Sequence, residues 1–450
     1  MNLKKLFGCG AALGAAAFLF ASSSDAYDAK YHVYQAGNGV GDALIFPVYA
    51  AGGSLKTNLR VINTSSKYSV VAKVVFREPN TSCEARDFFI YLSPNDEWTA
   101  DIVDMNGSIT ITSNDDSSPE VPLSVGMATT CNGYSANTGY VEVYGVAAMT
   151  FVDKTNNNAP LTGPISKGLI KQGYSTLYNN TSGVSFLSDP MGGNKTCVNN
   201  ASIDFTYSDK TYTMTYYPSQ NTMAGVEEIK DPTMNLVMPM VATALANNCN
   251  TQRVSVFEET RWDNYGYNSA VEVRAALAKS AIHIPYRQDA NNTTFAVFNF
   301  PVKLSCCLSG GTLCDGVLSV GDTCDLSKTY GTSIAQNIYD LQEHTTTTTT
   351  IYSPAPPGAK IEKEVYIAQL TPSFAEGWVR VKLTDAAAQQ SDNAADTTTS
   401  VSYAGSAVIP SYLQAASDLT WVPATFDCGV VTAGGTRYDN CTYQLTPNKK

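Results

Sequence analysis

Cysteines carry the most definite chemistry in this sequence. The chain has 11 of them, and Cys9 lies in an apolar segment at the N-terminus. Without Cys9 an even number remains, which is expected when thiols pair as disulfides in an oxidising compartment. These candidates are Cys83, Cys131, Cys197, Cys249, Cys306, Cys307, Cys314, Cys324, Cys428 and Cys441.

The best-supported pairing lies near the C-terminus. Cys428 and Cys441 bracket residues 430–438, where Gly434-Gly435 is suited to a hairpin tip. Because a hairpin brings its flanks within disulfide distance, we pair these two cysteines first. Proximity along the chain suggests two further pairings, Cys83 with Cys131 and Cys197 with Cys249.

The four cysteines between residues 306 and 324 allow two chemistries. If all were reduced, Cys306, Cys307, Cys314 and Cys324 would suit a four-thiolate metal site. In an exported protein disulfides are the expected state, because thiolates oxidise there. Adjacent Cys306 and Cys307 are then expected to bond to different partners, since a bond between neighbours strains the backbone.

The sequence gives little evidence for a catalytic site. A Ser-His-Asp triad needs a histidine beside a nucleophile, yet the chain has only His32, His283 and His344 and no Gly-x-Ser-x-Gly elbow. His283 alternates with Ile282 and Ile284, which indicates a residue on a sheet surface. We therefore expect no catalytic triad.

An acidic segment allows a second kind of enzyme. Glu258, Glu259 and Asp263 surround Trp262, and a glycosidase needs two carboxylates and often an aromatic platform. A solvated acidic turn is the alternative. Calcium is the only cofactor for which we find support, from oxygen-rich loops that lack EF-hand spacing. These loops contain Asp115 and Asp116, Asp153 with Asn156 and Asn158, and Asp392 with Asp396.

The elements around these residues are mainly strands. Residues 42–113 alternate apolar and polar side chains between Gly, Pro and Asn turns, and Asn106-Gly107 is a hairpin signal. In residues 70–77, Lys73 and Arg77 lie opposite the apolar side, as in a half-buried strand. This pattern predicts a mainly β protein with antiparallel β-sandwich domains, disulfides and a few short helices.

Two helices are predicted in the middle of the chain. Ser269 and Glu272 form a capping box before an Ala-rich segment at 270–281, and 333–343 is suited to a short helix. Six threonines at 345–350 indicate an exposed strand edge or a linker. The predicted organisation is a signal peptide at 1–26, an N-terminal β-sandwich at 27–165, a middle β-rich region at 166–343 with its Cys-rich loop at 306–324, a Thr/Pro-rich linker at 344–358 and a C-terminal β region at 359–450.

The N-terminus predicts export. Lys4 and Lys5 precede an apolar run at 6–20, and Ser24-Asp25-Ala26 has the small residues of a signal peptidase site. The run is shorter than the roughly 20 residues that a bilayer span requires, and no later stretch approaches that length. We expect cleavage after Ala26 and no transmembrane segment in the mature chain.

Charge excludes some partners. The formal net charge is −11, whereas nucleic acids and anionic membranes attract basic surfaces. Charged residues make up only 15% of the chain against a typical 25%, and 26 tyrosines are present. Uncharged polar surface favours packed assemblies over a cytosolic helical enzyme.

Several segments together resemble a group of secreted bacterial surface proteins. They are Gly-Asp-Ala-Leu-Ile-Phe-Pro-Val-Tyr at 41–49, Val-Ile-Asn-Thr-Ser at 61–65, Val-Ala-Lys-Val-Val-Phe-Arg-Glu at 71–78, Tyr-Leu-Ser-Pro-Asn-Asp-Glu-Trp-Thr at 91–99 and Phe-Asn-Phe-Pro-Val-Lys at 298–303. Val302 stands where the group has Thr. The resemblance covers about a third of the chain and implies an S-layer-like β-sandwich protein of the cell envelope, with no catalytic residue.

These observations favour a secreted structural or interaction protein of the cell surface that binds itself or other envelope proteins. The alternative location is the periplasm. A glycan-binding adhesin or binding module is the first alternative function, and exposed Tyr and Trp in one cleft would favour it. A secreted hydrolase with paired carboxylates is the second.

Overall fold

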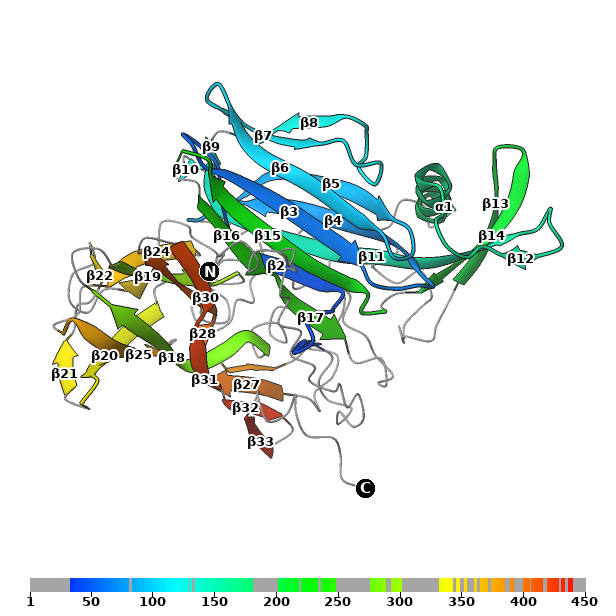
Figure 1. Ribbon diagram of the computed structural model, residues 1–450. Coiled ribbons are helices and arrows are strands. Elements are labelled where there is room, and N and C mark those ends of the chain that lie inside the picture. The colour runs from blue at the N-terminus through cyan, green and yellow to red at the C-terminus, as the bar shows by residue number, and fades with distance from the viewer. Residues whose placement is uncertain are drawn as a thin grey trace, which may run out of the picture.

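The structure is a computed structural model. It describes residues 33–80, 83–128, 130–131, 134–180, 201–217, 220–233, 236–247, 276–288, 293–301, 332–342, 345–348, 352–353, 360–361, 365–370, 374–384, 389–391, 400–404, 406–415, 419–428, 430–433 and 436–439. The protein is mainly β, and its paired strands are antiparallel (Figure 1).

A nine-stranded sheet is built around the 16-residue strand β11 (Thr138–Asp153). The first half of β11 pairs with β2 on one side and β4 on the other, and its second half pairs with β14. The other strands are β1 (Val33–Gln35), β2 (Ala43–Ala50), β4 (Ser69–Arg77), β5 (Glu84–Leu92), β12 (Ala159–Pro160), β13 (Ala201–Tyr207), β14 (Lys210–Tyr217) and β17 (Thr243–Asn247).

A six-stranded sheet has the order β16-β15-β3-β6-β7-β8. Its β6–β7 hairpin turns at Asn106 and Gly107, both with positive φ, as the Asn-Gly signal predicts. The strands are β16 (Leu236–Val241), β15 (Met223–Asp231), β3 (Lys56–Asn63), β6 (Glu97–Met105), β7 (Ser108–Ser113) and β8 (Leu123–Gly126). A short pair, β9 (Thr130–Cys131) with β10 (Tyr134–Ser135), lies near β5 of the nine-stranded sheet.

These two sheets contribute to one hydrophobic core. Phe46 on β2 and Val74 on β4 belong to the same buried cluster as Val61 on β3 and Trp98 on β6. Figure 1 shows the six-stranded sheet in front of β4 and β11. Trp98 also donates its indole N–H to Ser118 Oγ at 2.9 Å, which satisfies the one polar atom of the largest core side chain.

The C-terminal part forms three further sheets. The seven-stranded sheet contains β21 (Thr345–Thr348), β20 (Thr332–Asp340), β25 (Glu376–Thr384), β18 (Ala278–Arg287), β28 (Ser406–Ala407), β23 (Lys360–Ile361) and β31 (Thr425–Cys428). The five-stranded sheet contains β22 (Tyr352–Ser353), β24 (Val365–Leu370), β19 (Thr293–Asn299), β29 (Ile409–Ala415) and β30 (Leu419–Pro423). The third contains β26 (Gln389–Ser391), β27 (Ser400–Ala404), β32 (Val430–Ala433) and β33 (Thr436–Asp439). Ile282, Phe298 and Val379 join the first two sheets in one core.

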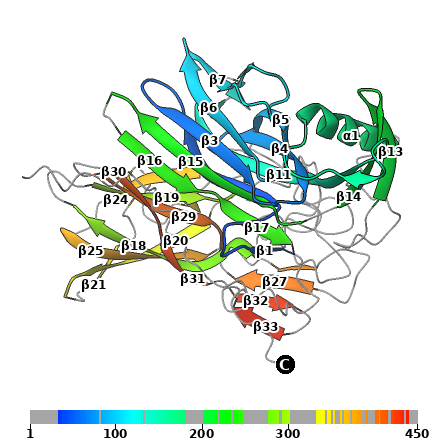
Figure 2. The same cartoon turned by 45° about the vertical axis from the view of Figure 1, so that its right-hand side comes forward.

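The N-terminal and C-terminal parts are joined by buried contacts. Asn299 donates its side-chain N–H to the carbonyl of Pro47 at 2.8 Å, and the Tyr140 hydroxyl donates to the carbonyl of Pro301 at 3.2 Å. Strand β30 lies against β16, as Figure 2 also shows. Both parts therefore contribute to the walls of any site that lies between them.

Helix α1 (Lys167–Asn180) was not predicted. It packs Leu169, Ile170 and Leu177 into the core beside the nine-stranded sheet, near β13 (Figure 2). Ser166 accepts the amide of Leu169 at 3.2 Å and so caps its start. With its 14 residues, α1 is longer than the short helices expected.

Several sequence predictions need correction. Strand β18 begins at Ala278, so the predicted helix at 270–281 is wrong over its last four residues; 276–277 are helical and 270–275 lie outside the described residues. The helix predicted at 333–343 is instead strand β20. Strands β13 to β17 belong to the N-terminal sheets, which therefore extend beyond the predicted boundary at 165.

The half-buried pattern predicted for β4 is also wrong. Both faces of β4 are buried, and the exposed fractions of Lys73 and Arg77 are only 1% and 5%. The Lys73 ammonium pairs with Asp87, and Arg77 pairs with Glu142. These ion pairs let a charged sheet face lie in the interior.

Candidate binding cleft

A cleft of about 450 Å³ lies between the N-terminal and C-terminal sheets. Its walls come from the ends of β1, β16 and β17 on one side, and from β18, β29 and β31 on the other. Apolar side chains predominate: Ala36, Pro47, Pro239, Met240, Val241, Ala242, Ala244, Val408, Ile409, Pro410, Ala424 and Phe426.

Lys279 is the charged residue of this cleft. Its side chain belongs to β18 and is 2% exposed. The ammonium donates a hydrogen bond to Gln35 Oε1 at 3.3 Å and lies 4.3 Å from the centre of the Phe426 ring. Burial lowers the pKa of Lys279 to about 7, and no described carboxylate offsets that effect.

Ser411 adds a second polar group. It lines the cleft from β29 and is almost fully buried, yet its hydroxyl has no hydrogen-bond partner among the described residues. Leaving a buried hydroxyl unpaired costs about 1–3 kcal/mol. Lys279, with its neutral amide partner, and Ser411, with its unpaired buried hydroxyl, therefore both line one largely apolar space.

Glu227 lies in the layer next to the cleft. On β15 it is in register with Leu59 on β3 and with Met240 on β16, and Met240 lines the cleft. Burial raises the pKa of Glu227 well above its ordinary value, and the nearby Val48 amide offsets only part of this. Among the described residues, no hydrogen bond of normal geometry reaches either carboxyl oxygen. Burial therefore favours the protonated form of Glu227.

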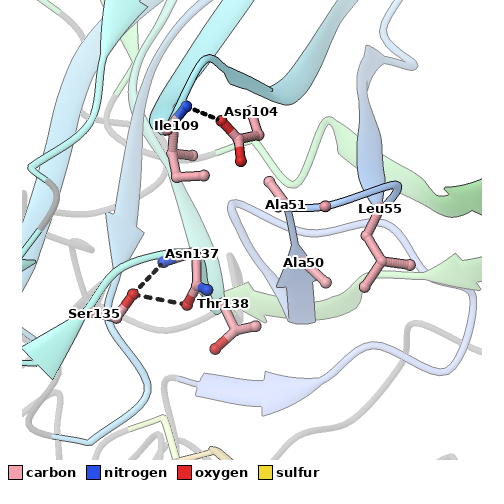
Figure 3. A pocket seen from close by; sticks show the side chains of 11 residues that line it. Ala50, Ala51, Leu55, Asp104, Ile109, Ser135, Asn137 and Thr138 are labelled. Carbon is pink, nitrogen blue, oxygen red and sulfur yellow. Dashed lines mark hydrogen bonds between the residues drawn. The ribbon is translucent and has the colours of Figure 1, made fainter.

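A second hollow, of about 320 Å³, lies at one end of the N-terminal sheets (Figure 3). The turn after β2, the β6–β7 hairpin and residues 135–138 line it. Its polar groups bind one another: the Ser135 hydroxyl donates to Asn137 Oδ1 at 2.8 Å, and Asp104 Oδ1 accepts the Gly107 amide at 2.6 Å. This hollow therefore offers less to a ligand than the cleft at Lys279.

Two of the predicted disulfides fall partly within the described residues. Cys83 is disulfide-bonded, but its partner is not among the described side chains. Ala128 donates to the carbonyl of Ala85 at 3.1 Å, which brings the chain before Cys131 beside the start of β5. The hairpin predicted before Cys441 is present as β32 and β33, with Ala433 opposite Thr436.

The remaining cysteines cannot be placed. Cys428 ends β31, but its side chain is not described. Outside the described residues lie Cys197, Cys249, Cys306, Cys307, Cys314, Cys324 and Cys441. All the predicted pairings therefore stay predictions.

Of the residues considered for catalysis in the sequence, only His283 lies within the described residues. His283 lies half-buried on the sheet surface, as predicted, with Nε2 3.6 Å from Asp427 Oδ1. Outside the described residues lie His32, His344, Glu258, Glu259, Trp262 and Asp263.

The described calcium candidates make local hydrogen bonds. Asp115 accepts the amides of Thr99 and Ser117, and Asp153 accepts those of Thr155 and Asn156. Asp392 and Asp396 lie outside the described residues. Within the described part of the chain, no group of three or more His, Cys, Asp or Glu side chains is arranged to hold a metal ion.

Neither the burial of Lys279 in the cleft nor the buried ion pairs were predicted from the sequence. Lys279 lies between Ala278 and Ser280, where the predicted helix would have left it in solvent. The signal available was the apolar alternation from residue 281 onward, which continues the strand back to Ala278. Glu142 gave a clearer signal. It interrupts an apolar strand, and the charge of a carboxylate buried there must be balanced by a basic neighbour.

Comparisons with protein-family models, with curated proteins and with solved structures found no match to this chain. Among the helices that the structure describes, none is both long and apolar enough to cross a membrane.

Proposed function

We propose that this chain is a secreted structural or interaction protein of the bacterial cell surface, S-layer-like in character. It binds copies of itself or other envelope proteins through the edges of its sheets. The observation that carries this proposal is the position of β21 at the end of the seven-stranded sheet (Figure 1).

Strand β21 has the properties of an open edge. It pairs with β20 on one side, and no described strand pairs with its other side. Edge strands carry unpaired N–H and C=O groups that recruit a strand from another chain, and charges or Pro normally block this. The strand consists of four threonines, with neither charge nor Pro.

The other sheets offer a contrast. Strand β13 ends the path through the nine-stranded sheet, and it carries Asp204 in an exposed ion pair with Lys154. A charge on an edge strand discourages pairing with a second copy. The proposal therefore assigns assembly to β21 rather than to β13.

Export, disulfides and a β-sandwich architecture belong to the same proposal. The core shared by the nine-stranded and six-stranded sheets supports the sandwich. The signal peptide pattern and the disulfide-bonded Cys83 support an oxidising, non-cytoplasmic location.

Fractionation of the producing cells tests this function. The proposal expects the protein in the surface fraction, with an N-terminus at Tyr27, and it expects external protease to digest the protein on intact cells. Recovery as a free protein of the periplasm or the medium would contradict it.

One observation favours a glycan-binding module as the second candidate. Trp378 is 37% exposed, its ring stacks on Tyr339 at a centroid distance of 4.1 Å, and His283 meets it edge-on. Exposed aromatic rings often bind sugars. A glycan array probed with the wild type and with Trp378→Ala tests this candidate. The wild type should bind glycans on the array, and the variant should lose that binding.

A further inference from the structure

We propose that the cleft at Lys279 is a binding site for a small organic monocarboxylate with an apolar body. The carboxylate would accept hydrogen bonds from the Lys279 ammonium and the Ser411 hydroxyl, and the apolar body would lie against the proline and aliphatic walls. This site is separate from the β21 edge.

Comparison with the other buried cations supports an anionic ligand. Lys73 is as buried as Lys279 but pairs with Asp87, and Arg77 pairs with Glu142. Among the described residues, the side chain of Lys279 has as partners only a neutral amide and an aromatic ring. A buried charge is stable when a counter-charge accompanies it. Because no described residue supplies one to Lys279, an anionic ligand would supply it.

The donors of the cleft match a carboxylate. An ammonium carries three N–H donors, and Gln35 accepts one of those of Lys279. Ser411 supplies a further donor that is unused within the described residues. A carboxylate accepts several hydrogen bonds through its two oxygens, and such charge-assisted bonds are the strong ones.

The remaining walls fit an apolar body. Pro47, Met240, Ile409 and Pro410 line the space and offer carbon surface. Its volume lies within the range of about 300–1,000 Å³ that small-molecule sites occupy. Val241, 68% exposed, stands at the edge of the cleft, where a ligand would cover it.

Calorimetry on the exported protein, with octanoate as the probe, tests the site. Octanoate should bind, whereas 1-octanol, which lacks the charge, and acetate, which lacks the chain, should each bind at least about tenfold more weakly. Equal binding of octanol or acetate, or no binding of octanoate, would overturn the proposal.

Variants assign the binding to Lys279. Lys279→Met should weaken octanoate binding by about tenfold or more, and Ser411→Ala by about threefold. Lys382→Met is the matched control, because Lys382 is exposed on the neighbouring strand β25, and it should bind octanoate as the wild type does. If Lys279→Met does not fold, Ser411→Ala and the wild-type ligand series still decide the question. Unchanged affinity in folded Lys279→Met, or in Ser411→Ala, would contradict the assignment.

Discussion

Arg77 Nε donates a hydrogen bond to Glu142 Oε2 at 2.8 Å inside the nine-stranded sheet, where both side chains are almost fully buried. The Tyr144 hydroxyl donates to the same oxygen at 2.5 Å. Burial by itself lowers the pKa of Arg77, but Glu142 and the neighbouring tyrosines raise it above its ordinary value. The three side chains therefore form one neutralised cluster on a sheet face that the sequence pattern assigned to solvent.

Breaking this cluster should destabilise the protein strongly. Arg77→Met leaves the Glu142 carboxylate buried without its cation, and such changes typically cost about 3–5 kcal/mol. Urea unfolding measures the loss. Lys154→Met is the control, because Lys154 forms an exposed pair with Asp204 and should change stability little. A similar small effect for both variants would show that Glu142 does not depend on Arg77.

Lys279→Met should stabilise the protein at pH 6, because it removes a buried ammonium that has no described counter-charge. The folded-state pKa of about 7 lies below the unfolded value, so the unfolded state binds more protons between pH 7 and pH 10. Wild-type stability should therefore rise with pH in this window relative to the variant, by at most about 1.4 kcal/mol per pH unit.

Thermal unfolding of both proteins from pH 6 to pH 10 measures this difference. The described groups that contact the Lys279 side chain, Gln35 and Phe426, do not titrate. Asp427, next to Phe426, is paired with Arg380. Octanoate binding should weaken over the same window as the amine loses its charge. Parallel stability curves for the two proteins would contradict the buried cation.

The contribution of Glu227 to stability should have the opposite pH dependence. Its folded-state pKa is raised, so the folded state holds a proton that the unfolded state loses above its ordinary pKa of 4.5. Stability should fall as pH rises from 5 to 8, and Glu227→Gln should remove this fall. Urea unfolding at both pH values tests it. Glu228→Gln is the control, because Glu228 is partly exposed and pairs with Lys230. An unchanged slope in Glu227→Gln would contradict the prediction.

Cys83 should be bonded to Cys131. Mass spectrometry of the non-reduced, digested protein is expected to recover one peptide pair containing both residues. Replacing both with Ser should lower stability by about 2–4 kcal/mol, because the bond restricts the unfolded chain. Recovery of Cys83 with any other cysteine would refute this pairing.

The turns that depend on residues next to each other in the sequence were predicted correctly. The hairpin at Asn106-Gly107 follows from two residues that tolerate positive φ, and the hairpin at 430–438 from two glycines. The helix predicted at 270–281 is wrong at 278–281, because helix propensity, even that of an Ala-rich segment, is a weak determinant that tertiary contacts override. Pairing of β18 with β25 and β31 outweighs it.

The buried charges and the cleft depend on distant contacts. The alternation in β4 does not reveal that its Lys73 and Arg77 face would also be covered. The cleft combines residues near 35, 240, 279 and 410, whose proximity follows from the packing of the two parts of the molecule. No local pattern encodes such proximity, so the sequence alone could not predict this site.

The most direct test of the central claim is whether the exported protein assembles through β21. Light scattering after size exclusion, followed by electron microscopy, compares the wild type with Thr345→Lys/Thr347→Lys. Thr345 and Thr347 are in register with the half-buried residues Tyr339 and Asn337, whereas Thr346 is in register with buried Ile338.

Thr99→Lys, on the internal strand β6, is the control. The account predicts ordered sheets, filaments or higher oligomers for the wild type and the control, and monomers for the β21 variant. A monomeric wild type, or a β21 variant that assembles as the wild type does, would contradict it.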